Sequence, residues 1–167
     1  LKESGEVQKA MSYFEKAIKI NPNDASVYNN LGNCHEELED YKKAASCYEK
    51  AIEINPNFAD AYNNLGIVFK RLGEVQKAIN CYKKTIQLQS SHADAHNNLG
   101  VVFKELGEIQ EAISCFEKAI EINPNYVIVY NNLALVFREL NEFKKAVSYY
   151  EKALNLDPNR EEICEGY

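Results

Sequence analysis

The sequence has no tryptophan, one methionine and four prolines, and it has no apolar run near the roughly 18 residues of a membrane span. Its first ten residues also lack the basic and then apolar order of a signal peptide, so we expect no contact with a membrane. Basic residues are in deficit, with 19 Lys and Arg against 25 Asp and Glu. The resulting net charge of −6 argues against nucleic acid, because phosphate binding needs clustered cations.

Histidine is scarce, with only His35, His92 and His96, and this limits the chemistry that the chain can perform. Cys34 and His35 are neighbours in one predicted helix, so their side chains point about 100° apart and do not form a nucleophile and base pair. His92 and His96 have i, i+4 spacing, but no C-x-x-C motif and no third fixed ligand accompany them. We therefore predict a chain that is not an enzyme and has no metal site and no cofactor.

Three of the five cysteines, Cys47, Cys81 and Cys115, are evenly spaced along the chain, and Cys34 and Cys164 fall outside this series. If the chain consists of repeats that stack at about 8–10 Å, equivalent Cα atoms lie beyond the roughly 7 Å limit for a disulfide. We therefore expect free thiols that serve packing rather than redox sensing. Reduced cysteines fit an intracellular protein, and we expect a cytoplasmic location.

Internal repetition is what the sequence has in abundance. An Asn-Asn-Leu triplet begins at Asn29, Asn63, Asn97 and Asn131, so the interval between triplets is constant and equals the interval between the three cysteines. Glycine follows the first three triplets, and alanine follows the fourth. A second series, in which an alanine is followed four residues later by an aromatic residue, has the same period: Ala10, Ala44, Ala78, Ala112 and Ala146.

Within a repeat, apolar residues return at helical spacing in two blocks, which predicts two helices. Tyr28, Leu31 and Leu38 mark the predicted buried side of one first helix. Gly73 and Gly107 stand between the two helices of their repeats, where glycine can take the left-handed conformation that ends a helix. We predict tight antiparallel hairpins.

Asn-Pro-Asn ends most of the predicted second helices, because proline biases the preceding residue away from helix. One repeat has Ser90 in the place of this proline, and we expect Ser91 to be the N-cap of the helix that follows. Each predicted repeat therefore has a marked boundary.

The order of a large residue, Leu-Gly, an aromatic residue, alanine and a second aromatic residue resembles the tetratricopeptide repeat (TPR) family over residues 5–160. Tyr62, Leu65, Gly66, Phe69, Ala78 and Tyr82 carry it in one unit. The resemblance implies an all-α, right-handed α-solenoid of antiparallel helix hairpins, the TPR superhelix. We expect repeats at 25–58, 59–92, 93–126 and 127–160, between a second helix of a truncated repeat at 1–24 and, at 161–167, the start of a truncated repeat or a cap.

The asparagine pairs are unfavourable in a helix, since each asparagine destabilises the helix by a few tenths of a kcal/mol relative to alanine. We expect them on the side of the first helix opposite the buried residues, which in this family lines the concave surface. A carboxamide matches the C=O and N–H of an extended peptide, although a packing role explains the pairs equally well. The family's O-GlcNAc transferases carry a similar asparagine ladder, which corresponds here to Asn30, Asn64, Asn98 and Asn132. The full predicted peptide-binding set is Asn29, Asn30, Asn33, Asn63, Asn64, Ile67, Lys70, Arg71, Asn97, Asn98, Val101, Lys104, Asn131, Asn132, Leu135 and Arg138.

The leading hypothesis is a non-catalytic scaffold that binds an extended protein or peptide segment, of acidic character because the predicted face is basic. One alternative is the substrate-recruiting arm of a larger enzyme, such as a protein glycosyltransferase. Another is a structural role with end-to-end self-association through the truncated repeats, since both ends fall inside a repeat and suggest a piece of a longer array.

Overall fold

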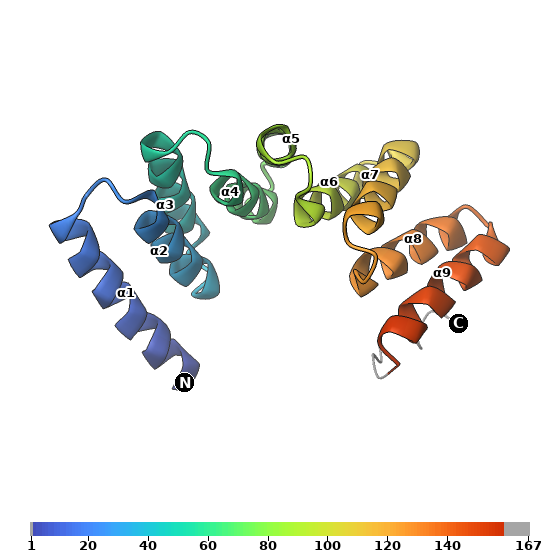
Figure 1. Ribbon diagram of the computed structural model, residues 1–167, viewed down its shortest axis with the longest axis horizontal. Helices are drawn as coiled ribbons and strands as arrows, with labels where there is room; N and C mark the ends of the chain where they lie inside the picture. The colour runs from blue at the N-terminus through green and yellow to red at the C-terminus, as the bar shows by residue number, and fades with distance from the viewer. Residues whose placement is uncertain (1, 159–167) are drawn as a thin grey trace. The chain divides into compact units, whose positions relative to one another are not determined.

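The structure is a computed structural model that describes residues 2–158, and within this range the chain forms helices and no strands (Figure 1). The helices are α1 (Lys2–Ile20), α2 (Ala25–Glu37), α3 (Tyr41–Ile54), α4 (Ala59–Arg71), α5 (Val75–Leu88), α6 (Ala93–Glu105), α7 (Ile109–Ile122), α8 (Val127–Glu139) and α9 (Phe143–Leu156). Residues 161–167, where we predicted the start of another repeat, lie outside the described residues. None of the helices within 2–158 combines the length and apolar character needed to cross a bilayer.

The chain divides into two compact units, Leu1–Ser90 with α1 to α5 and Ser91–Tyr167 with α6 to α9. The closest packing is within hairpins, where α2 lies on α3, α4 on α5, α6 on α7 and α8 on α9. Each hairpin also packs on its neighbour in the same unit, because α1 lies on α2, α3 on α4, and α7 on α8. Within the units, α2, α4 and α8 therefore each contact two second helices.

The turn inside each hairpin contains one residue in the left-handed conformation. Gly73 and Gly107 have φ values of 77° and 78°, which confirms the predicted role of glycine at these two turns. Glu39 and Asn141 hold the equivalent places without glycine, at φ values of 58° and 59°. A left-handed residue other than glycine costs about 1–2 kcal/mol, so the surrounding hairpins compensate for two unfavourable residues.

The links between hairpins are ordered by asparagine side chains. Oδ1 of Asn21 accepts a hydrogen bond of 3.2 Å from the backbone N–H of Asn23. The same bond recurs at Asn55 and Asn123, so each Asn-Pro-Asn segment forms a turn through the first asparagine. These turns reverse the chain before the next first helix.

The start of α6 differs from our expectation of a serine cap. Its N-cap is His92, and Nδ1 of His92 accepts a hydrogen bond of 3.2 Å from the backbone N–H of Ala95. The prediction of Ser91 as N-cap is therefore wrong by one residue. A neutral imidazole accepts through one ring nitrogen and can cap a helix as serine does.

Glycines in three first helices allow close approach of the second helix. A Cβ atom at Gly32 would lie 2.5 Å from the Tyr48 ring, and one at Gly66 would lie 2.6 Å from the Tyr82 ring. Gly100 faces Phe116 in the same manner, at 2.8 Å. The Leu-Gly pairs of the repeat therefore specify hairpin packing, because any side chain there would displace a buried ring.

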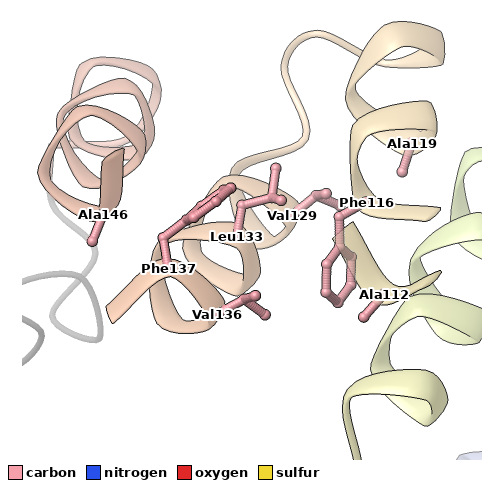
Figure 2. Packing of buried hydrophobic residues seen from close by; sticks show 8 residues of the cluster. All are labelled: Ala112, Phe116, Ala119, Val129, Leu133, Val136, Phe137 and Ala146. Atoms are coloured by element: carbon pink, nitrogen blue, oxygen red, sulfur yellow. The ribbon is translucent and has the colours of Figure 1, made fainter. Parts of the chain in front are cut away.

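The second unit shows how hairpins join (Figure 2). A buried cluster of this unit, shown in Figure 2, combines side chains of α7, α8 and α9. The cluster consists of Ala112, Phe116, Ala119, Val129, Leu133, Val136, Phe137 and Ala146. A second helix thus packs on its own first helix and on the next one, which is how stacked hairpins bury faces that one hairpin leaves exposed.

Candidate functional site

The predicted binding residues lie on the first helices, and we call this surface the first-helix face, formed by α2 and α4 in one unit and by α6 and α8 in the other. Asn29, Asn63 and Asn97, which begin three of the pairs, are only 6–8% exposed. The expectation that both asparagines of a pair lie opposite the buried side is therefore wrong for these three. Leu38 was predicted to be buried and is exposed, because it forms the C-cap of α2.

The second asparagine of one repeat binds the first asparagine of the repeat before it. In the first unit, Nδ2 of Asn64 donates to Oδ1 of Asn29 at 3.2 Å and to Oδ1 of Asn33 at 3.3 Å. These bonds join α4 to α2. Because Asn29 is buried, its carbonyl needs a partner inside the protein, and Asn64 supplies that partner.

The second unit repeats this arrangement. Nδ2 of Asn132 in α8 donates to Oδ1 of Asn97 in α6 at 3.0 Å. The donor follows the acceptor by 35 residues in both units, which is one more than the 34-residue interval between successive Asn-Asn-Leu triplets. The asparagine pairs therefore have a packing role, and the cost of asparagine in a helix is offset by bonds between repeats.

Tyr48 adds a contact that the periodicity did not predict. The ring of Tyr48 is fully buried between α2 and α3, yet its hydroxyl lies 2.8 Å from Oδ1 of Asn33 and 2.9 Å from Oε2 of Glu36. Burial, with the nearby Glu36 carboxylate, raises the pKa of Tyr48 above its usual range. The signal in the sequence was the choice of tyrosine over phenylalanine at a core position.

The predicted apolar residues of the face, Ile67, Val101 and Leu135, are half-buried. Val101 packs against the core cluster of its unit, and Leu135 packs beside the buried Ala134 and Tyr150. Val101 and Leu135 therefore each have one side in the core and another side accessible from the face. Such residues can contact a ligand without a change in the packing of the repeat.

The basic residues of the face differ in their surroundings. Nζ of Lys104 in α6 forms an ion pair of 3.0 Å with Glu139 in α8. Arg71 and Arg138 are exposed, whereas Lys70 is half-buried. The positive charge predicted for the face is therefore partly neutralised in the second unit, and the two arginines are its most accessible cations.

The remaining asparagines differ in exposure from one repeat to the next. Asn30 and Asn33 in α2 are exposed, whereas Asn98 and Asn131 are half-buried. Asn98 accepts a long contact of 3.5 Å from Nδ2 of Asn97, its neighbour in the chain. The structure thus brings Asn29, Asn33 and Asn64 together in one unit and Asn97, Asn98 and Asn132 together in the other.

The described cysteines, Cys34, Cys47, Cys81 and Cys115, form no disulfide, and Cys164 lies outside the described residues. Burial, with the Glu49 carboxylate nearby, raises the pKa of the Cys81 thiol to about 11. Burial likewise raises the pKa of the Cys34 and Cys47 thiols. Since the thiolate is the reactive form, these environments suit packing better than nucleophilic chemistry.

No group of three or more His, Cys, Asp or Glu side chains in residues 2–158 is arranged to hold a metal ion. The features that remain as a candidate site are the amides, the half-buried apolar side chains and the arginines of the first-helix face. None of these groups is a strong acid, base or nucleophile at neutral pH, whereas all of them suit non-covalent recognition of another chain.

Comparisons with known proteins agree with this architecture. Family models described as tetratricopeptide repeat match residues 57–125, 91–159 and 25–58, and one described as TPR repeat matches residues 1–38. No curated protein matched this chain.

Among solved structures, MamA is 28% identical with a TM-score of 0.81, and the match covers 99% of this chain and 95% of MamA. PilF of Pseudomonas aeruginosa is 22% identical with a TM-score of 0.88, over 96% of this chain and 73% of PilF. YrrB, described as a TPR protein with an unusual peptide-binding site, is 23% identical with a TM-score of 0.76, over 99% of this chain and 85% of YrrB. The last two likenesses show a shared fold.

Proposed function

This chain belongs to the tetratricopeptide repeat family, whose repeats serve as scaffolds for protein–protein interaction, and we propose that its first-helix face binds an extended peptide segment. One observation carries the proposal. Nδ2 of Asn64 donates both of its hydrogens, one to Asn29 and one to Asn33, so Oδ1 of Asn64 is the group that remains for another partner. A carbonyl held in this way is an oriented acceptor for the backbone N–H of a bound chain.

The spacing of first helices suits an extended ligand. Neighbouring helices pack at about 8–10 Å, and an extended chain rises about 3.3 Å per residue, so equivalent positions on α2 and α4 meet every third ligand residue. Asn30 and Asn64 hold those equivalent positions in the first unit. Peptide binding by YrrB, a protein of the same fold, supports this use of the repeats.

Hydrogen bonds alone do not hold the ligand. Two hydrogen bonds to the peptide backbone, one from Asn30 and one from Asn64, contribute about 0.5–1.5 kcal/mol each. Their sum falls short of an association cost of about 4–15 kcal/mol. Apolar contacts with half-buried Ile67 have to supply the remainder for a segment bound on the first unit, and half-buried Val101 and Leu135 offer the same kind of contact to a segment bound on the second unit. The exposed Arg71 and Arg138 favour a segment with acidic side chains.

The test uses peptides selected from a random library displayed on phage, with affinities then measured by fluorescence anisotropy. Asn30→Ala combined with Ile67→Ser should weaken binding at least tenfold, because the double variant loses an exposed amide that binds the peptide backbone and an apolar contact. Ile20→Ser is the matched control, since Ile20 is an exposed isoleucine of the same unit that lies at the end of α1. Equal affinity of the double variant and the wild type would contradict the proposal, and so would a selection that yields no binding peptide.

A further inference from the structure

We infer that a surface hollow on the hairpin of α6 and α7 binds a lysine side chain of a partner protein. The hollow has a volume of about 360 Å³, and it is lined by Phe103 of α6 and by Gln110, Glu111, Ser114 and Cys115 of α7. These residues are separate from the peptide-binding set of the first-helix face. The inference is therefore independent of the proposed function.

The acidic start of α7 differs from the start of the other second helices. Three of those helices begin with an acidic N-cap that forms an ion pair with a lysine three residues later. The pairs are Asp40 with Lys43, Glu74 with Lys77, and Glu142 with Lys145. The α7 helix has Glu108 as its N-cap and Glu111 three residues later, and both are exposed. Two like charges therefore stand where the other helices have an ion pair.

The lysine also covers an aromatic ring of the first helix in two of those hairpins. Nζ of Lys77 lies 5.0 Å from the centre of the Phe69 ring, and Nζ of Lys145 lies 4.8 Å from the centre of the Phe137 ring. The two phenylalanines are only 8% and 5% exposed. Phe103 holds the same place in α6 and is half-buried, so part of its ring is open to the hollow.

The hairpin of α4 and α5 is the closest internal comparison. Cys81 and Cys115 hold the same place in α5 and α7, whereas α9 has Tyr149 there, stacked on its phenylalanine at 5.5 Å. Phe69 is buried although its hairpin has the small cysteine. We therefore attribute the exposure of Phe103 to the glutamate that replaces the covering lysine.

The backbone of the two hairpins is alike at this turn. The N–H of Glu108 donates to the C=O of Phe103 at 2.9 Å, and the equivalent bond in the hairpin of α4 and α5 is 2.8 Å long. Both turns contain a left-handed glycine. A cation over the Phe103 ring would therefore meet the Glu108 carboxylate as Lys77 meets Glu74.

The chemistry of the hollow selects lysine. An aromatic face attracts a cation within about 6 Å, and the carboxylates of Glu108 and Glu111 add attraction for a cation and repel an acid. A bound ammonium group also relieves the repulsion between these two carboxylates. The aliphatic stem of lysine can pack along the apolar part of the hollow, and the net charge of −6 attracts a basic partner.

The binding test uses peptides from a random library displayed on phage, with the full chain as the target. The library is first depleted on Glu111→Lys, in which the chain's own lysine fills the hollow, so peptides that bind the first-helix face are removed. Peptides then recovered on wild type should contain a lysine. Replacement of that lysine by norleucine, which keeps the aliphatic chain and removes the charge, should weaken binding at least tenfold in fluorescence anisotropy.

Two variants locate the bound lysine. Phe103→Leu should weaken binding of the recovered peptides at least fivefold, because leucine is apolar but has no aromatic face. Glu121→Lys is the control, since it makes the same change of charge at an exposed position near the other end of α7 and should leave affinity unchanged. The inference is overturned if depletion leaves no binding peptide, if norleucine binds as well as lysine, or if Glu121→Lys weakens binding as much as Phe103→Leu.

A second measurement needs no ligand. Glu111→Lys should raise the melting temperature by about 2–4 °C, because the new lysine pairs with Glu108 and covers the Phe103 ring. Glu111→Gln is the matched control, since glutamine removes the repulsion without supplying a cation. A lysine variant no more stable than the glutamine variant would show that the ring does not accept a cation there, and would overturn the inference.

Discussion

The side-chain amide of Asn132 in α8 donates a hydrogen bond of 3.0 Å to the buried carbonyl of Asn97 in α6. This bond joins two repeats of the second unit and has a counterpart between Asn64 and Asn29 in the first unit. It makes the asparagine pair a device for aligning first helices. The exposed side of those helices, where we propose that a peptide binds, is then held in place.

Removal of this bond should weaken the second unit. Asn97→Ala should lower the free energy of unfolding by about 1–2 kcal/mol, because the amide of Asn132 loses its acceptor and a buried side chain leaves a gap. A double-mutant cycle with Asn132→Ala should give a coupling of about 0.5–1 kcal/mol, measured by urea denaturation. Asn30→Ala is the control, since an exposed asparagine should change stability by less than about 0.5 kcal/mol. A coupling near zero would show that the bond contributes nothing.

The contact between Gly66 and the Tyr82 ring should make Gly66→Ala destabilising. The added Cβ would lie 2.6 Å from the ring, and we expect a loss of about 1–3 kcal/mol from overpacking, measured by thermal unfolding. Gly5→Ala is the matched control. A Cβ at Gly5 in α1 meets nothing within 4 Å, so alanine should stabilise that helix by about 0.5–1 kcal/mol. Equal effects of the two substitutions would refute the packing role of the Leu-Gly pair.

Introducing a glycine at one hairpin turn and removing a glycine from another should change stability in opposite directions. Glu39→Gly should raise stability by about 1 kcal/mol, because φ at this position is 58° and glycine adopts that value without strain. Gly107→Ala should lower stability by a similar amount, since φ there is 78° although a Cβ would meet no neighbour. The free energy of unfolding of both variants is measured by chemical denaturation. A destabilising Glu39→Gly would mean that the side chain of Glu39 stabilises the turn.

The buried thiol of Cys81 should make stability depend on pH. Its pKa is raised from 9.0 in the exposed chain to about 11 in the fold, so the folded state holds the proton more tightly. The stabilisation is complete below pH 9 and is lost as the pH rises toward 11, at up to about 1.4 kcal/mol per pH unit. Cys81→Ala should flatten this part of the curve. The same slope in the variant would assign the loss to other groups, such as the buried tyrosines.

Much of the fold follows from the constant period of the sequence, because helical spacing and helix-ending residues recur together. Gly73 and Gly107 were recognisable as turn residues from their place between two apolar blocks. Glu39 and Asn141 were not, since neither residue type requires a left-handed conformation. The helix start at His92 was missed for a similar reason, because serine is the commoner cap.

The candidate site was harder to predict than the fold. Periodicity treats asparagine as a surface residue, and the burial of Asn29 depends on an amide from Asn64, which is remote in sequence. The offset that this pair shares with Lys104 and Glu139 was present in the sequence, yet it has meaning only after the helices are packed. The partial neutralisation of the basic face has the same origin.

The central claim, that a peptide lies on the first-helix face, is tested most directly by NMR of side-chain amides during titration with a selected peptide. The amide resonances of Asn30 and Asn64 should shift, while those of Gln76 and Asn80, which lie together on α5, should stay unchanged. Shifts confined to Gln76 and Asn80 would place the ligand on the second helices and contradict the account.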